Sequence, residues 1–271
     1  MPADSPTPAI KGPATTTTVT FPSGGQVIDA TTETTRQWHS CAATHVGHVR
    51  KVNEDAFLDA REQSLWVVAD GMGGHSRGDR ASQCIIEQLD GFVALDTASD
   101  SIAELRRRLD TANRVCREAA RGGVMGSTVA ALYLHNDRAH VTWAGDSRIY
   151  RIRAGDCTQL TDDHSLVQEL HRLGEMTAEE AENHPSSNVI TRAVGVADEL
   201  DLQLRQVDLL PGDRFLICSD GLFKDVRATE IHENLMKPSP RQALDALMSL
   251  ALRRGGTDNV TGIVVQVPFE G

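Results

Sequence analysis

The sequence predicts an α+β fold with largely antiparallel sheets and helices outside them. Apolar runs of strand length recur along the chain, and segments with helical spacing of apolar residues lie between them. These strands and helices come in clusters and do not alternate strictly, which argues against a doubly wound parallel sheet. Two predicted strands meet at the turn 145–147, and such a short connection favours antiparallel pairing.

Five strands and five helices follow from these patterns. The strands are runs of mostly apolar residues, at 65–69, 128–134, 140–144, 215–218 and 260–267. In the helices, apolar residues return every three or four positions, at 81–89, 102–120, 166–173, 228–236 and 241–253.

Length and composition fit one substantial domain. With 271 residues and 40% hydrophobic content, the chain is able to bury a large core. The formal net charge of -11 argues against nucleic acid or an anionic membrane as a partner, because both would be repelled. An acidic total also accompanies a carboxylate-lined cation site, although solubility alone explains most acidic proteins.

The cysteines and the N-terminus indicate a soluble, cytoplasmic protein. The five cysteines form an odd set without a Cys-x-x-Cys pair, which is typical of reduced, mostly buried thiols. The first residues lack the basic and apolar stretches of a secretory signal, and no apolar run has the length of a membrane span.

We expect residues 1–36 to form a disordered arm before a domain at 37–271. Prolines and the Thr-rich runs at 15–18 and 31–35 dominate the arm, and few of its residues suit a core. The arm is interpreted as a solvated leader, with regulatory phosphorylation of its threonines as the alternative.

Four aspartates stand at the edges of strongly apolar runs. Asp70 and Asp220 each end a predicted strand and precede a glycine, Asp146 follows a third strand, and Asp258 lies just before the last one. One Asp-Gly pair is most often a turn, but four aspartates at strand ends are able to meet at one rim of a sheet. Clustered carboxylates repel one another, so the cluster implies a bound cation. All-oxygen ligands favour Mg²⁺ or Mn²⁺ over zinc.

Two further segments suit a phosphate and metal site. Gly71 leaves its backbone carbonyl open to an ion, although a flexible turn explains the glycines around it equally well. Arg50 lies four residues before the carboxylate pair Glu54 and Asp55. Its guanidinium suits bidentate binding of a phosphate, whereas a surface salt bridge is its commoner role.

Seven motifs, in sequence order over residues 38–267, resemble those of the PPM family, also called type 2C phosphatases. They are Arg50-x-x-Asn53-Glu54-Asp55, Val68-Ala69-Asp70-Gly71-Met72-Gly73-Gly74-His75, Gly126-Ser127-Thr128, Gly145-Asp146-Ser147-Arg148, Asn188-Val189-Ile190-Thr191-Arg192, Cys218-Ser219-Asp220-Gly221-Leu222 and Asp258-Asn259-Val260-Thr261.

This resemblance implies an αββα sandwich, in which two mainly antiparallel sheets pack face to face with helices on both outer faces. It also implies two tightly bound Mn²⁺ or Mg²⁺ ions at one end. By the family pattern Asp70 bridges both ions and the nucleophilic water, the Gly71 carbonyl binds one ion, and Asp220 and Asp258 bind the other. Asp146, sharing Asp220, matches a possible third metal site.

The remaining motif residues receive roles in the same way. Glu54 and Asp55 match acidic residues that hold metal-bound waters or contact the ions, and Arg50 matches the phosphate-binding arginine. Residues 162–190 resemble a mobile flap beside the active site. Asn188 and Arg192 belong to the motif at its end.

Some residues depart from the family pattern or stay outside it. Met72 stands where animal members carry a candidate general acid, His, so the acid is unassigned. Lys224 follows the Asp-Gly-Leu motif where the family often has Asp, and we interpret it as exposed, with an effect on substrate preference as the alternative. His75, His164 and His184 are interpreted as structural or exposed.

The activity implied is hydrolysis of phosphoserine and phosphothreonine on proteins by metal-activated water. The sequence lacks the Cys-to-Arg offset of cysteine phosphatases and any Asp-x-Asp, so a phosphoenzyme is not expected. A two-metal nuclease, a catalytically silent binding module and a calcium-binding protein are the alternatives. The expected partners are phosphorylated proteins and a Hanks-type kinase in bacterial signalling, with this protein a monomer.

Overall fold

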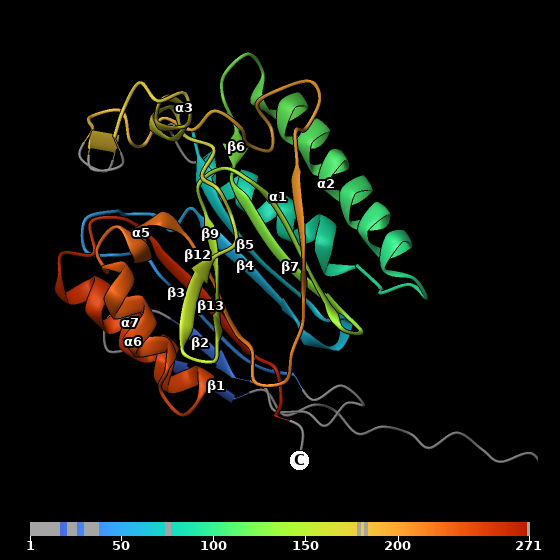
Figure 1. The fold of residues 1–271 in the computed structure, drawn as a ribbon. Coiled ribbons are helices and arrows are strands. Elements are labelled where there is room, and N and C mark those ends of the chain that lie inside the picture. Colours follow the sequence, from blue (N-terminus) through green and yellow to red (C-terminus); the bar gives the residue numbers. More distant parts are fainter. Residues whose placement is uncertain are drawn as a thin grey trace, which may run out of the picture.

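Two antiparallel sheets pack face to face, and helices cover both outer faces (Figure 1). The computed structural model describes residues 17–20, 26–29, 38–73, 77–177, 180–181 and 184–269. Every pairing between described strands is antiparallel. This arrangement confirms the αββα sandwich implied by the family resemblance.

The first sheet has seven strands in the order β1-β2-β3-β13-β12-β9-β10. Their bounds are β1 Thr17–Thr20, β2 Gln26–Asp29, β3 His39–His45, β9 Arg148–Arg153, β10 Asp156–Gln159, β12 Arg214–Cys218 and β13 Val260–Gln266.

The second sheet has six strands, five of them in the order β11-β8-β7-β5-β4, with β6 paired to the end of β5. Their bounds are β4 Asp55–Ala60, β5 Leu65–Met72, β6 Gly126–Ser127, β7 Val129–His135, β8 Arg138–Ala144 and β11 Gln203–Asp208.

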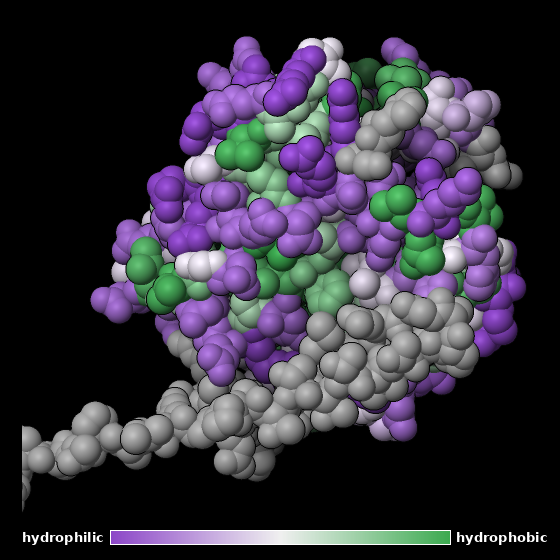
Figure 2. All heavy atoms as spheres, turned by 180° about the vertical axis from the view of Figure 1, so that it is seen from behind, coloured by the Kyte–Doolittle hydropathy of each residue, from purple (hydrophilic) through white to green (hydrophobic). Residues whose placement is uncertain are grey.

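The helices divide between the two outer faces. Helices α1 and α2 pack on the second sheet, whereas α6 and α7 pack on the first, and α3 lies beyond one end of the sheets (Figure 1). The bounds are η1 Arg61–Gln63, α1 Gly78–Asp90, α2 Ala98–Ala120, α3 Leu166–Arg172, α5 Asp220–Phe223, α6 Ala228–Leu235 and α7 Pro240–Arg253. Outside the grey residues, Figure 2 shows a face covered mainly by hydrophilic side chains, with hydrophobic residues in separate small areas.

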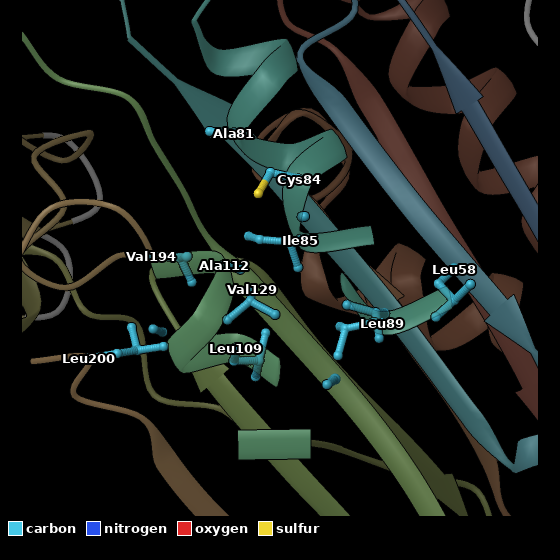
Figure 3. Packing of buried hydrophobic residues seen from close by; sticks show 14 of the residues in the cluster. Leu58, Ala81, Cys84, Ile85, Leu89, Leu109, Ala112, Val129, Val194 and Leu200 are labelled. Carbon is cyan, nitrogen blue, oxygen red and sulfur yellow. The ribbon is translucent and has the colours of Figure 1, made fainter. Parts of the chain in front are cut away.

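The core has three layers, and β5 shows how they arise. Leu65 and Val67 face the helices α1 and α2, whereas Trp66 and Val68 face the other sheet. A strand buried on both faces must be apolar at successive positions, which is why this segment reads as a continuous hydrophobic run. Figure 3 shows the outer layer, where α1 residues such as Ile85 pack beside α2 and the strands.

The five predicted strand ranges correspond to β5, β7, β8, β12 and β13, which contain continuous apolar runs. No ranges were predicted for β3, β4, β6, β9, β10 and β11, because these strands are short or have polar residues among their apolar ones. The turn 145–147 also differs from expectation. It joins β8 to β9, which lie in different sheets, so the chain crosses from one sheet to the other there and forms no hairpin.

Two short strands lie within the arm that was expected to be disordered. β1 pairs with β2, and β2 continues the first sheet beside β3, so these two segments differ from the expectation. Apart from β1 and β2, residues 1–36 fall outside the described part of the chain. Their expected disorder stays a prediction. The five cysteines form no disulfide bonds; four are buried and Cys157 is half-buried, as predicted. Across the described residues, no helix is both long and apolar enough for a membrane span.

Candidate active site

Five aspartates lie close enough for their charges to interact, at the rim of the sandwich where β5 meets β6, and these two strands meet at the upper end of the sheets in Figure 1. In the second sheet, Asp55 at the start of β4 lies directly opposite Asp70 near the end of β5. Antiparallel pairing thus places a strand beginning and a strand ending at the same rim.

The first sheet supplies the other three carboxylates. The end of β12 leads into Asp220. This end of β12 pairs with the start of β13, which follows Asp258. The start of β9 is the other neighbour of this strand end, and Asp146 lies in the crossover just before β9. All four aspartates singled out in the sequence are therefore brought together, and Asp55 joins them.

Burial, together with the charges of neighbouring carboxylates, raises the pKa values of Asp55, Asp70 and Asp146. Burial raises the pKa of Asp70 well above its usual range, and the charges of Asp55, Asp220, Asp146 and Asp258 raise it further. Burial, followed by the charge of Asp220, raises the pKa of Asp146 to about 7. The protein therefore concentrates negative charge that is unfavourable unless protons or cations neutralise it.

Asp55 carries the clearest sign of an incomplete coordination shell. Burial raises its pKa to about 7, against the lowering effect of hydrogen bonds from Thr261 and Ser219. The Ser219 hydroxyl donates to Oδ2 at 2.7 Å, which orients the carboxylate, while Oδ1 is buried without a hydrogen-bond partner. Oδ1 of Asp146 is equally buried and unpaired. Unpaired buried carboxylate oxygens suit hard divalent cations.

We expect the metal-free protein to lose stability as the pH rises through neutrality. The pKa values of Asp55 and Asp146 are about 7 in the folded state, and both are raised above the ordinary value. The folded state therefore holds protons that the unfolded state has released, and the stability from these groups is lost as pH rises toward and through about 7. Thermal melts in a chelator between about pH 5 and about pH 8 measure this fall. A flat or rising melting temperature would contradict it, and Asp55→Asn should weaken the pH dependence.

The backbone of Asp70 is fixed by the neighbouring strand. Its N–H donates to the Thr128 hydroxyl at 3.0 Å, and its carbonyl accepts from the Thr128 N–H at 2.8 Å and the Ser127 hydroxyl at 2.9 Å. The Thr128 hydroxyl also lies 2.7 Å from that of Ser147, next to Asp146. This hydrogen-bonded chain links two of the carboxylate-bearing loops.

Asn259 holds another part of the site, and the sequence analysis gave it no role. Its side chain accepts from the Glu54 N–H at 2.8 Å and donates to the carbonyls of Val46 at 2.8 Å and Val52 at 3.0 Å. One amide therefore ties the loop that carries Arg50 to the start of β13. Asn259, Ser219 and Thr128 all stand within the quoted motifs, and that was the only signal available for them.

Two basic side chains lie on the carboxylates. Arg50 Nη2 is 2.7 Å from Asp258 Oδ2, and about half of the arginine side chain (52%) is exposed. Lys224 pairs with Asp220 and also donates to Asn188. Lys224 is exposed, as expected, but its ammonium group contacts the Asp220 carboxylate.

Glu54 and Gly71 lie at the N-terminus of α1. The Glu54 carboxylate accepts a hydrogen bond from the Gly78 N–H, and burial raises its pKa. A Cβ on Gly71 would lie 2.1 Å from the Gly78 carbonyl oxygen, so close backbone packing requires a glycine here. This packing explains the glycine without the open carbonyl that was predicted to bind an ion.

The other predicted residues lie around the cluster. Arg192 pairs with Asp201 at 2.9 Å and not with the cluster carboxylates. His164 is buried, stacks on Trp143 and accepts from the Gly145 N–H at 3.2 Å, which confirms a structural role. His75 lies outside the described residues.

The donor set fits two hard divalent cations, on the strength of the unpaired oxygens of Asp55 and Asp146 and the shared charge around Asp70. The described side chains do not form a closed ligand set, since no three His, Cys, Asp or Glu are arranged around one point. Arg50 contacts Asp258 and Lys224 contacts Asp220, in each case through Oδ2, so a divalent ion at either aspartate would share the carboxylate with a cationic side chain.

Comparisons with known proteins identify the family of this chain. The protein phosphatase 2C family matches residues 44–254. Protein phosphatase PhpP of Streptococcus pneumoniae is 36% identical over 240 residues, which cover 84% of this chain and 96% of the relative.

Solved structures show the same fold. PppA, described as a key regulatory component of T6SS in Pseudomonas aeruginosa, has a TM-score of 0.78 and 45% identity, covering 84% of this chain and 96% of that one. The catalytic domain of the serine threonine protein phosphatase PstP, solved in complex with 2 manganese ions, has a TM-score of 0.77 and 34% identity, covering 85% and 98%. The chain therefore belongs to the protein phosphatase 2C family.

Proposed function

We propose that this chain is a metal-dependent protein phosphatase that hydrolyses phosphoserine and phosphothreonine on proteins. The observation that carries the proposal is the convergence of five aspartates at one end of the sandwich, around the buried Asp70. Family membership and the named phosphatases among its relatives point to the same chemistry.

The ligands of two Mn²⁺ or Mg²⁺ ions are assigned to Asp70, the Gly71 carbonyl, Asp220 and Asp258. When bound, the ions would neutralise phosphate charge and make water a better nucleophile near neutral pH. The two manganese ions in the related PstP domain support a centre with two ions. Asp55, oriented by Ser219, lies beside Asp70 and suits the positioning of a water proton.

Arg50 is assigned to the substrate phosphate. Its guanidinium lies at the rim of the cluster on Asp258, and its exposure leaves N–H groups available to a phosphoprotein. A guanidinium binds two phosphate oxygens at once, which fixes the orientation of the phosphorus.

The partners proposed are phosphorylated proteins and, behind them, a Hanks-type serine/threonine kinase in a bacterial cytoplasm, with this protein acting as a monomer. The 45% identity with PppA favours a regulatory role in a type VI secretion system as the process served.

The test is hydrolysis of a phosphothreonine peptide by purified protein, with Mn²⁺ and with a chelator. Arg50→Ala is expected to lower kcat/KM by about 10- to 100-fold, mainly through KM, because a charged hydrogen-bonding partner of the phosphate is lost. Lys51→Ala, at the exposed neighbouring position, serves as the matched control and should change little. A folded wild type without Mn²⁺-dependent hydrolysis would overturn the proposal. A nuclease would show itself by cleaving DNA or RNA in a gel assay.

A further inference from the structure

Lys224 is a cation built into the carboxylate cluster. It follows α5 directly, one helical turn after Asp220, and its backbone N–H donates to the Asp220 carbonyl at 2.9 Å. This spacing turns the lysine side chain back over Asp220, and its ammonium group contacts Asp220 Oδ2.

The charge of Lys224 reaches beyond Asp220. Burial lowers its pKa, but the charges of Asp220, Asp146 and Asp70 outweigh this and leave the pKa raised. In turn, its charge lowers the pKa of Asp146. The ammonium group thus contacts Asp220 and acts through its charge on Asp146, and these are the two carboxylates that, by the family resemblance, would hold a third metal ion.

We infer that the Lys224 ammonium group takes the place of a third divalent cation between Asp220 and Asp146, so that this chain binds two metal ions and not three. The inference rests on the proposed function, because it concerns the same metal centre. A divalent ion at that position would be repelled by the ammonium group. It would also have to share the Asp220 carboxylate with Lys224. The possible third ion therefore does not fit the residues of this chain.

The surroundings hold Lys224 in this position. Its ammonium group also donates to Asn188 Oδ1, which belongs to the segment predicted as a flap. The preceding residue, Phe223, lies under the Arg148 guanidinium at 3.8 Å, and Arg148 is paired with Asp163 at 2.7 Å. Lys224 thus has Asp220 and Asn188 as partners, and its ammonium group lies at the cluster although 38% of its side chain is exposed.

The test counts bound Mn²⁺ by calorimetric titration and by elemental analysis of the equilibrated protein. Wild type is expected to bind two ions per chain. Lys224→Met, which removes the ammonium group alone, and Lys224→Asp, which restores the acidic residue frequent in the family, are expected to bind a third, weaker ion. The control is Lys237→Asp, which makes the same change of charge away from the cluster. The Lys237 backbone carbonyl accepts a hydrogen bond from Arg214, at the opposite end of β12. This variant should still bind two ions.

Three ions in the wild type, or two in the wild type and in both folded Lys224 variants, would overturn the inference. Three ions in either variant with two in the wild type would support it. The number of bound ions does not depend on catalysis, so this test and the test of the proposed function fail independently. A wild type that binds two ions but hydrolyses no phosphopeptide would defeat the proposed function and leave the role of Lys224 standing, whereas a wild type that binds none would defeat both.

Discussion

Asp70→Asn is expected to abolish phosphatase activity and, at the same time, to stabilise the metal-free protein. The carboxylate is the proposed ligand common to both ions, and an amide oxygen carries no charge to hold them. We expect kcat/KM to fall by at least about 10³-fold, which corresponds to about 4 kcal/mol of transition-state stabilisation. The stabilisation arises because the charges of Asp55, Asp220, Asp146 and Asp258 no longer face a fifth carboxylate.

The two effects have separate measurements. Phosphopeptide hydrolysis in Mn²⁺ gives the loss of activity, and thermal melts in a chelator at about pH 8 give the gain in stability. Added Mn²⁺ should raise the melting temperature of the wild type much more than that of the variant, because ligand binding stabilises only the form that binds it. Asp156→Asn, at an exposed position on β10, is the control for loss of one carboxylate. A variant that stays active, or that melts below the metal-free wild type, would show that Asp70 does not lie at the centre of this charge.

The sequence was informative about the carboxylates because each stands beside a strand buried on both faces. Such strands read as continuous apolar runs, and the residues that end them must reach a rim. The sequence was less informative about which carboxylates meet at the same rim of the sheets. Asp55 was predicted only as a contact to the ions or their waters, since β4 lacks a continuous apolar run and the pairing of Asp55 with Asp70 depends on strand register.

The supporting residues could not be predicted for a related reason. The hydrogen bond from Ser219 to Asp55 and that from Glu54 to Asn259 join positions far apart in the chain. Contacts of this kind depend on how the two sheets are brought together, and no local pattern encodes them. The exposure of Lys224 was predicted correctly, but its contacts with the site were not, because its spacing from Asp220 is visible in the sequence and its contact with Asn188 is not.

Gly71→Ala is expected to destabilise the protein by about 3 kcal/mol, through overpacking of backbone against backbone. The added Cβ would lie 2.1 Å from the Gly78 carbonyl oxygen and 2.6 Å from that of Glu54. Neither oxygen is able to move alone, because Gly78 begins α1 and the Glu54 carbonyl accepts hydrogen bonds from the Gly71 N–H at 3.0 Å and the Ser82 hydroxyl at 2.6 Å.

Thermal melts of the metal-free protein should therefore show a drop of about 6–12 °C for Gly71→Ala. Gly155→Asn is the matched control, since that glycine has a φ of +90° with open space around it, and asparagine tolerates such a backbone. The two interpretations of Gly71 diverge here. If the glycine serves only to leave its carbonyl open to an ion, the variant should melt with the wild type in a chelator and lose stability only against the Mn²⁺-bound form. If backbone packing requires it, the loss appears without metal, and displacement of Glu54 and the adjacent Asp55 lowers activity as a consequence.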